Sequence, residues 1–554
     1  MQEAPARPEP QAEGYATHEV TNQPGDLIGY NAYAQDPALC AAMRAFGGDW
    51  AEDRLRDLGE TVGSARMVAL AREANRQTPE LLSHDRFGNR IDQIAFHPAW
   101  HELMAIARGS GAHSLAWSAD RPGAQVARAG LSYLLNQGEN GVCCPITMTF
   151  ASRAALSQAP ALWAELGPGI LSEDYDPSPR PAAQKTALSV AMAMTEKQGG
   201  SDLRQITTQA RPGGGDLWLL TGHKWFFSVP QSDLVLTLAQ APKGVTCFLA
   251  RGWLADGRRN HFLLQQLKDK CGNRSNASAE VEFRDLEAEM VGEEGRGIAT
   301  ILGMAHLTRL DCAISSGAIM RQALRQAIHH ASHRQAFQRR LIDQPLMANV
   351  LTDLALDAEA FLWSGLRMAQ TQDGGEAEHL LGRLVIPMGK YLACKRASAF
   401  VAEALECHGG NGYVETHLMA RLYREAPLNG VWEGSGNVIC LDVLRSIAQR
   451  PESLTLWRDE VALARGQSRV FDAALEDLTA RLRDAQGIES RARQLVEHMA
   501  RLFQASLLLR HAPNDMADLF CRARLGGEAG QDYGTLPDLT HSRAILARAA
   551  VGEI

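Results

Sequence analysis

The sequence contains no apolar run near the ~20 residues that a transmembrane helix requires, and its first 25 residues are rich in Pro, Gln, Glu and Ala. That segment resembles neither a signal peptide nor a membrane anchor, and we interpret residues 1–25 as a flexible extension. The 10 cysteines include no Cys-x-x-Cys pair and a single adjacent pair, Cys143–Cys144. This distribution argues against a disulfide framework and favours a cytoplasmic protein without a membrane partner.

Several motifs that bind nucleotides, metals or acyl groups are also missing. The chain has no G-x-G-x-x-G after a strand-like segment, no G-x-x-x-x-G-K-[ST], no G-x-S-x-G and no H-E-x-x-H. Their absence argues against a Rossmann site, a P-loop, a hydrolase elbow and a zinc protease site. The histidine groups lack a carboxylate or cysteine at ligand spacing, so we interpret them as surface or core-edge residues rather than metal ligands. These groups are His97 with His101, and His329 with His330 and His333.

The length of 554 residues predicts two to four domains. Apolar residues recur at helical spacing over 26–185, while 186–295 contains short apolar segments separated by turns, including turns at Thr221–Lys224 and Ala241–Gly244. Four long helical stretches follow over 296–447, and 448–554 is a further helical segment. We predict a mostly α, α+β protein: an N-terminal helical domain, a small antiparallel β barrel or sandwich, a C-terminal four-helix bundle and an additional C-terminal helical domain.

Two glycine-rich turns are candidates for ligand binding. In Met194-Thr-Glu-Lys-Gln-Gly-Gly-Ser-Asp202 the glycines allow close approach of the backbone, and N–H groups and hydroxyls can donate to a phosphate or a ring oxygen. In Val431-Trp-Glu-Gly-Ser-Gly-Asn437 a carboxylate beside a tryptophan would be partly desolvated, which raises its pKa and suits a general base. Taken singly, each segment is also consistent with an ordinary capped turn.

Five motifs in order resemble those of the acyl-CoA dehydrogenase family. They are MTEKQGGSD, Gly222-His-Lys-Trp-Phe-Phe-Ser228, Arg334-Gln-Ala-Phe337 followed by Gln344, Gly409-Gly-Asn-Gly-Tyr413, and WEGSGN. Within the family, four segments are similar in sequence to those of the AidB branch, which is linked to the adaptive response to DNA alkylation. These segments are NQPGDL, CPITMTFA, GHKWFFSVPQSD and LKDKCGNRSNAS. This resemblance extends over nearly the whole chain.

The resemblance implies that the protein binds FAD and forms a homotetramer in which subunits share the cofactor. Three residues, Arg334, Phe337 and Gln344, match positions that reach the FAD of a neighbouring subunit. The other implied flavin-site residues are Met192, Ala193, Met194, Thr195, Glu196, Lys197, Gln198, Gly199, Gly200, Ser201, Phe226, Phe227, Ser228, Val431, Trp432, Gly434, Ser435, Gly436 and Asn437.

By the same resemblance, Glu433 is the catalytic base that removes a proton α to a thioester carbonyl, and Ser201 and Arg309 contact the substrate. Two departures concern the coenzyme: His306 stands where many relatives have an acid near CoA, and Glu406 replaces a glutamine near the adenine end. We therefore expect a flavoprotein with weak dehydrogenase activity on acyl-CoA substrates resembling isovaleryl-CoA. The alternatives are an acyl-CoA dehydrogenase of fatty or branched-chain acid metabolism with no role at DNA, and a structural protein in which FAD is mainly a stabilising ligand.

The C-terminal segment contains a local excess of arginine although the whole chain has a net charge of −8. Eight arginines fall within 44 residues that hold five acids, and guanidinium groups bind phosphates in a salt-dependent way. The same charges are also consistent with a solvated helix face carrying i,i+4 ion pairs. The resemblance favours non-specific binding and protection of duplex DNA. The candidate residues are Arg481, Arg483, Arg491, Arg493, Arg501, Arg510, Arg522 and Arg524.

Overall fold

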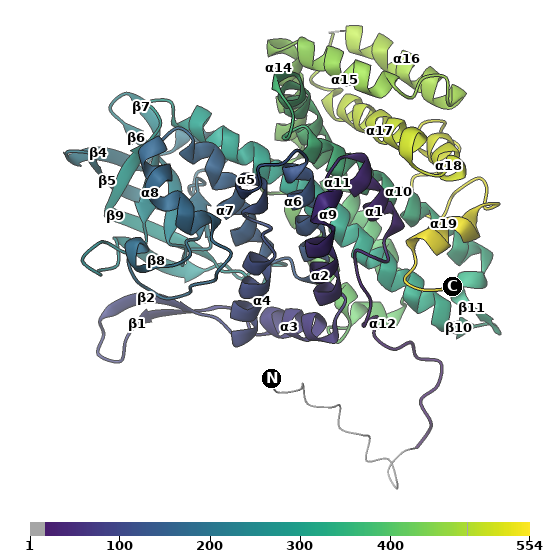
Figure 1. Cartoon of the computed structure of the whole chain (residues 1–554), viewed down its shortest axis with the longest axis horizontal. Helices are drawn as coiled ribbons and strands as arrows, with labels where there is room; N and C mark the ends of the chain where they lie inside the picture. Colours follow the sequence, from purple (N-terminus) through teal and green to yellow (C-terminus); the bar gives the residue numbers. More distant parts are fainter. Residues whose placement is uncertain (1–16, 485) are drawn as a thin grey trace.

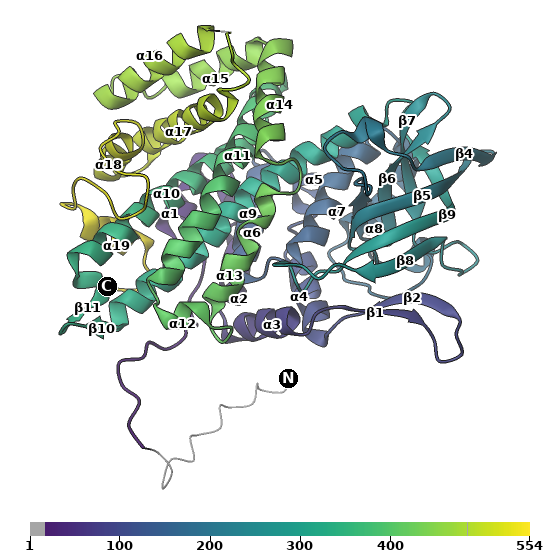
Figure 2. The ribbon, with the colours of Figure 1, turned by 180° about the vertical axis from the view of Figure 1, so that it is seen from behind.

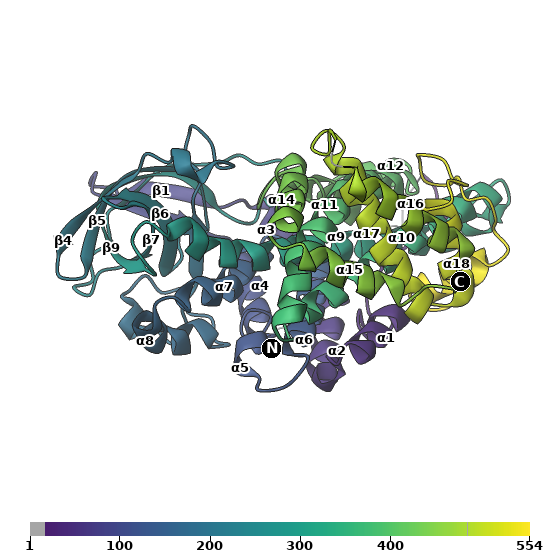
Figure 3. The same ribbon diagram turned by 90° about the horizontal axis from the view of Figure 1, so that it is seen from above.

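The computed structural model describes residues 17–484 and 486–554, and most of the predicted extension lies outside this range. In its described part, 17–25, Asn22 exchanges two hydrogen bonds of 2.7 and 2.8 Å with the backbone of Gln335. The β domain and the C-terminal helices lie at opposite ends of the long axis, with the central helices between them (Figures 1 and 3). None of the described helices is long and apolar enough to cross a membrane.

The N-terminal region is helical, as predicted, except for one hairpin. Its helices are α1 (Pro37–Ala45), α2 (Glu52–Val62), α3 (Ala65–Arg76), α4 (Pro98–Gly109), α5 (Leu115–Ser118), α6 (Ala124–Gly138), α7 (Cys143–Leu156) and α8 (Pro160–Leu171). The helical prediction is wrong for β1 (Glu80–His84) and β2 (Arg90–Ala95), which pair antiparallel. Asp85 forms their turn by accepting from the N–H groups of Phe87 and Asn89. Leu81 and Ile94 pack against the core of the β domain, so tertiary packing selects the strands.

The β domain is a closed ring of strands, which confirms the predicted barrel. Its strands are β3 (Val190–Ala193), β4 (Gln209–Gly214), β5 (Leu217–Ser228), β6 (Leu234–Ala241), β7 (Gly244–Arg251), β8 (Phe262–Leu267) and β9 (Ser278–Val291). Pairing runs β6–β4–β5–β9–β7 and returns to β6, while β3 and β8 add to β6 and β9. Most pairs are antiparallel, but β3–β6 and β4–β6 are parallel.

One of the two predicted turns in this domain is present. The chain reverses between Ala241 and Gly244, as expected. The turn predicted at Thr221–Lys224 is wrong because β5 continues through it, with a register shift between Leu220 and Gly222. Gly222 has φ +156, and a side chain there would meet Thr208 at 2.5 Å. The glycine therefore marks a bulge within the strand rather than its end.

The bundle is built on α9 (Gly297–His333), which packs against α6 and α7 as well as α10 (Pro345–Gln370) and α11 (Glu376–Glu406). The fourth long helix, α14 (Gly436–Gln449), packs on α11. A small hairpin, β10 (Gln335–Ala336) and β11 (Arg339–Arg340), follows α9, and α12 (Gly410–Tyr413) and α13 (Leu418–Glu425) follow α11. The predicted four-helix bundle is thus confirmed, with its hydrophobic core continuing into the N-terminal helices.

The C-terminal helices cover one side of α10, α11 and α14 (Figure 2). They are α15 (Glu452–Ala462), α16 (Arg469–Arg483), α17 (Ala492–His511), α18 (Asn514–Arg524) and α19 (Ser542–Ala549). Their attachment centres on Asp357 of α10, whose carboxylate is fully buried. The groups that contact this carboxylate are Arg396 at 2.9 Å, Arg501 at 3.2 Å, Arg524 at 2.9 Å and the Tyr533 hydroxyl at 2.8 Å.

Candidate functional site

A cavity of about 480 Å³ lies between the β domain and the bundle. Its walls come from the ends of β3 and β5, the first half of α9, the α6–α7 junction and the turn before α14. Both glycine-rich turns identified in the sequence contribute to it. The predicted site residues that line it are Met192, Met194, Thr195, Gly200, Ser201, Phe226, Ser228, Arg309, Val431, Trp432, Glu433, Gly434 and Ser435.

The first turn is held by a buried ion pair. Glu196 accepts from Lys224 Nζ at 2.8 Å, and both side chains are fully buried. The same carboxylate accepts from the N–H groups and hydroxyls of Thr207 and Thr208. Because its oxygens are used inside the β domain, Glu196 shapes the turn rather than lining the cavity. The carbonyl of Thr195 accepts from Trp225 N at 2.8 Å, which fixes the turn against β5.

The second turn places Glu433 in a left-handed conformation, with φ +57, directly before Gly434 with φ +100. A non-glycine residue rarely adopts a positive φ, and such strain is often found at functional sites. The Thr308 hydroxyl on α9 donates to Glu433 Oε2 at 2.7 Å. Burial raises the pKa of the Glu433 carboxyl, while Thr308, Arg309 and Lys390 oppose that shift. A carboxylate of raised pKa, held in a cavity, can act as a proton acceptor near neutral pH.

Two cations hold the backbone of this turn. Arg309 donates to the Glu433 carbonyl at 3.0 Å and also pairs with Asp442 at 2.8 Å. Lys390 donates to the carbonyls of Trp432 and Gly434 at 3.0 and 2.5 Å. Neither cation bonds the Glu433 carboxylate, so the turn is fixed without neutralising the candidate base.

Other predicted flavin residues do not line the cavity in this chain. Phe227 is fully buried among the β strands, and Asn437 is exposed on α14. Arg334 donates to the Asn22 carbonyl at 2.5 Å, and Gln344 donates to the Ala336 carbonyl at 2.9 Å, both around the β10–β11 hairpin. Phe337 is 91% exposed there. The remaining residues outside the lining are Ala193, Glu196, Lys197, Gln198, Gly199 and Gly436.

The cavity fits a flat aromatic cofactor. Phe226, at 49% exposure, and Trp432 offer ring surfaces, and Thr195, Ser201 and Ser228 offer hydroxyls. A side chain at Gly200 would meet the Thr195 hydroxyl oxygen at 2.4 Å, so this turn is closely packed only because the residue is glycine. These groups match what an isoalloxazine ring requires: apolar faces with hydrogen-bond donors at its edges.

Sequence reasoning missed a polar group at one end of the cavity. Lys270, Glu425, Cys144 and Asn140 line it but were given no role. Lys270 falls within the quoted segment LKDKCGNRSNAS, so the available signal was a lysine in an otherwise polar loop. Thr308, which bonds Glu433, was missed as well; its position next to Arg309 on a helix was the available hint.

The two coenzyme-side departures occupy different environments. His306 lies on α9 one turn before Arg309, and burial, with help from Arg383 and Arg309, lowers its pKa to about 3. It therefore offers a neutral imidazole where many relatives have an acid. Glu406, the last residue of α11, is exposed to solvent.

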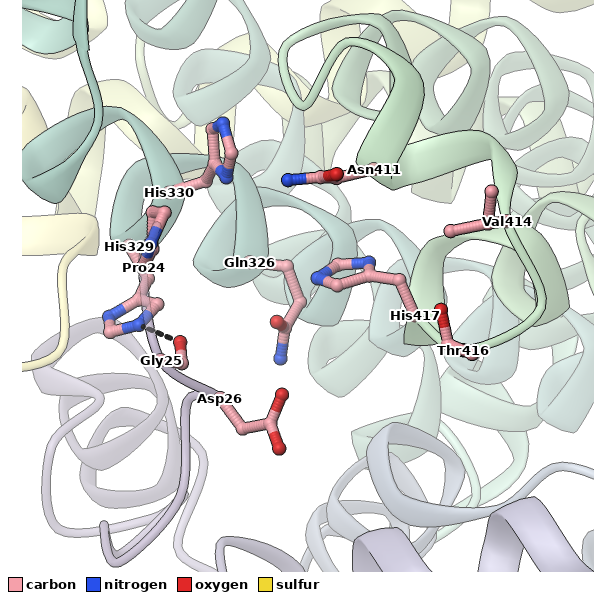
Figure 4. Close-up of a pocket in the computed structure, with 10 residues that line it drawn as sticks. All are labelled: Pro24, Gly25, Asp26, Gln326, His329, His330, Asn411, Val414, Thr416 and His417. Atoms are coloured by element: carbon pink, nitrogen blue, oxygen red, sulfur yellow. Dashed lines mark hydrogen bonds between the residues drawn. The ribbon is translucent and has the colours of Figure 1, made fainter. Parts of the chain in front are cut away.

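A second cavity, of about 180 Å³, lies at the other end of α9 (Figure 4). His329 Nε2 is 2.8 Å from the Gly25 carbonyl, which ties the N-terminal segment to α9. Next to it, the rings of His330, His408 and His417 form a row with centroids 4.8 Å apart. Burial lowers the pKa of His330 to about 4 and that of His408 to about 3, so the row is neutral at pH 7. The row packs the ends of α9 and α11 together.

The predicted DNA-binding arginines fall into groups. Arg501 and Arg524 are directed at α10 of the bundle, where they pair with Asp357 and Asp353. Arg510 pairs with Glu460 of α15, a carboxylate that also pairs with Arg367 of α10. These three arginines hold the C-terminal helices together and against the bundle instead of forming a surface patch. On the surface, Arg481 pairs with Asp477, Arg491 with Asp484, and Arg522 with Glu528. Across the described ranges, Arg483 and Arg493 have no carboxylate within 4.0 Å, and both are exposed.

Comparison with known protein families divides the chain in the same way as its architecture. Residues 22–177 match the adaptive response protein AidB N-terminal domain. Residues 191–286 match the acyl-CoA dehydrogenase middle domain, and 295–448 match the acyl-CoA dehydrogenase C-terminal domain.

Individual relatives extend the similarity along the chain. AidB of Escherichia coli (strain K12) is 44% identical over 93% of this chain and 96% of its own length. Acyl-CoA dehydrogenase family member 11 of Caenorhabditis elegans is 28% identical over 87% of this chain and 84% of its own. The crystal structure of C. elegans ACDH-11 in complex with C11-CoA superimposes with a TM-score of 0.85 at 26% identity, covering 92% of this chain and 94% of the other.

Proposed function

Because this chain belongs to the acyl-CoA dehydrogenase family, and within it is similar to AidB, we propose that it binds FAD in the 480 Å³ cavity. Members of this family are flavoproteins, and the cavity offers aromatic faces and hydroxyl donors. The observation that carries the proposal is Glu433, whose carboxylate faces the cavity with a raised pKa and a single hydroxyl partner.

Glu433 would remove the proton α to the thioester carbonyl of an acyl-CoA. Arg309 and Lys390 hold its backbone, and Thr308 orients its carboxylate, so the base is already positioned before a substrate enters. Ser201 and Arg309, which both line the cavity, would contact the substrate. When bound, FAD would supply the acceptor for the hydride from the β carbon.

Reduction of bound flavin by isovaleryl-CoA tests this role. We expect the absorbance near 450 nm to bleach in the wild type and not in Glu433→Gln, which keeps the size of the side chain but removes the base. Glu376→Gln is a matched control, because it makes the same change at an exposed position at the start of α11 that does not line the cavity. Equal bleaching by wild type and Glu433→Gln would contradict the assignment.

We also propose a role beside DNA, with non-specific binding to duplex as part of an alkylation response. The exposed Arg483 and Arg493, together with the neighbouring Arg481 and Arg491, support this role. Phosphate contacts of this kind weaken as salt rises. The similarity to AidB favours this function over that of a dehydrogenase of fatty or branched-chain acid metabolism without a DNA role.

The double change Arg483/Arg493→Glu tests DNA binding at two salt concentrations. We expect it to reduce duplex affinity by about tenfold or more at low salt and to reduce the salt dependence. The matched control, Arg86/Arg284→Glu, makes the same charge change at exposed positions of the hairpin and the β domain. If both pairs have the same effect, the C-terminal patch is not the binding surface.

We propose, finally, that the protein is a homotetramer. Large apolar side chains are exposed on the segments that follow α9 and α11, which supports burial of this end by another copy. These are Phe337 at 91%, Leu346 at 82%, Tyr413 at 78% and Val414 at 48% exposure. Light scattering of the wild type and of Phe337→Asp/Leu346→Asp tests the assembly, and an unchanged mass would contradict this interface.

A further inference from the structure

The polar end of the larger cavity contains a lysine without a counter-ion. Lys270 lies in the loop between β8 and β9 and lines the cavity. Its Nζ donates to the Asn276 carbonyl at 2.5 Å and to the Ser278 hydroxyl at 3.2 Å. No carboxylate of the described residues lies within 4.0 Å of it. Burial lowers its pKa to about 8, so the ammonium remains mostly charged at neutral pH.

The titratable groups nearest Lys270 are Cys144 and Glu425, which partly oppose the lowering of its pKa by burial but form no ion pair with it within 4.0 Å. Cys144 on α7 has a pKa raised by burial to about 12, so its thiol is uncharged. Glu425, at the end of α13, accepts from Asn273 N at 2.6 Å, and burial beside Glu139 raises its pKa to about 7. The charge of Glu433 also raises the pKa of the Cys144 thiol. Lys270 is therefore the group that sets the positive potential at this end of the cavity.

A short hydrogen-bonded chain joins Lys270 to the wall assigned to the flavin. Ser278 Oγ is 3.1 Å from Ser228 Oγ, and both residues line the cavity. Ser228 ends β5 two residues after Phe226, whose ring forms part of the same wall. Lys270 Nζ is thus two hydrogen bonds away from Ser228.

We propose that Lys270 tunes the flavin electrostatically: its ammonium stabilises the negative charge that two-electron reduction places on the ring, and so raises the reduction potential. This inference rests on the proposed binding of FAD. A charge fixed in a cavity of low dielectric interacts more strongly than the same charge in water. Lys270 acts through the Ser278–Ser228 chain and the field, and is a positioning residue rather than a catalytic one.

The midpoint potential of bound FAD in Lys270→Met tests the proposal, measured against a redox dye of known potential. We expect the equilibrium constant for two-electron reduction to fall about tenfold, which corresponds to a potential lower by about 30 mV. Lys270→Arg should retain most of the wild-type potential. The matched control is Lys243→Met, because Lys243 is paired with Glu294 at 3.3 Å and does not line the cavity. A potential unchanged in Lys270→Met, or lowered equally in Lys243→Met, would overturn the proposal.

A measurement on the wild type covers the case in which Lys270→Met does not fold. The visible spectrum of bound FAD should titrate with a midpoint near 8 as Lys270 loses its proton, and Glu425→Gln should move that midpoint to lower pH because the Glu425 carboxylate raises the pKa of Lys270. The absence of a step between pH 7 and 9 would overturn the role of Lys270. Wild-type protein that takes up no FAD would overturn the proposed function itself, which is a separate outcome.

Discussion

Asp357 is fully buried and Glu433 is half-buried at the cavity; both are carboxylates of the bundle region, yet their surroundings are opposite. Asp357 is contacted by three guanidinium groups and a phenol, and the arginines Arg524, Arg501 and Arg396 outweigh its burial and hold its pKa well below the usual range. Glu433 has one hydroxyl partner, and burial raises its pKa. The first carboxylate is saturated and joins two domains. The second is left under-coordinated in a cavity, as a reactive acid or base must be.

Removing the carboxylate of Asp357 should have the largest effect on the stability of the protein. We expect Asp357→Asn to lower the free energy of unfolding by about 3–5 kcal/mol, because it leaves buried guanidinium groups without their counter-ion. Urea denaturation followed by circular dichroism measures this loss. A change below about 1 kcal/mol would mean that the cluster is not what holds the C-terminal helices.

The contrast between saturated and exposed charges also applies to the arginines of the C-terminal segment, which should contribute unequally to the free energy of unfolding. Arg501→Met should destabilise the protein by about 3 kcal/mol because Asp357 loses a buried partner. Arg483→Met, at an exposed position, should cost less than about 0.5 kcal/mol. Comparing the two denaturation midpoints checks the division between anchoring and surface arginines. Equal losses of stability in the two variants would contradict this division.

The buried histidine row should make the protein sensitive to acid. Its folded pKa values lie below the ordinary value of 6.5, so the unfolded chain binds more protons at low pH. Stability is then complete above pH 6.5 and falls as the pH decreases below it, by about 2 kcal/mol at pH 5 for His408. Thermal unfolding between pH 5 and 7 measures this slope, and His408→Gln should flatten it. An equally steep slope in His408→Gln would assign the acid sensitivity to other groups.

Changes at Glu433 should alter chemistry more than stability. Thr308→Val removes a hydrogen bond to the charged form, so the pKa of Glu433 should rise further and flavin reduction by a substrate should shift to higher pH. Its free energy of unfolding should change by about 1 kcal/mol or less. A pH profile identical to that of the wild type would show that Thr308 does not control the base.

Much of the fold and half of the site follow from the sequence, for identifiable reasons. Periodicity predicts the long helices, and the two glycine-rich turns meet at one cavity as the family motifs implied. The β1–β2 hairpin was missed because only its contact with the β domain makes its weak alternation favourable. Lys270 was missed because its proposed role depends on having no carboxylate close to it among the described residues, and the sequence alone does not reveal that. Arg501, Arg510 and Arg524 look like a basic patch in the sequence, since their carboxylate partners lie far away along the chain.

The closed ring of β strands has a consequence for solubility. Strand edges with unused N–H and C=O groups invite pairing with other chains. In the ring, β6, β4, β5, β9 and β7 each have a neighbour on both sides, with β4 and β6 meeting at the single pair Gln209–Gln240. The two added strands are shielded: Arg90 donates to the Leu264 carbonyl of β8 at 2.6 Å, and the Thr149 hydroxyl of α7 accepts from Val190 N of β3 at 3.2 Å. The β1–β2 hairpin therefore covers the edge of β8 and opposes edge-to-edge association of the β domain.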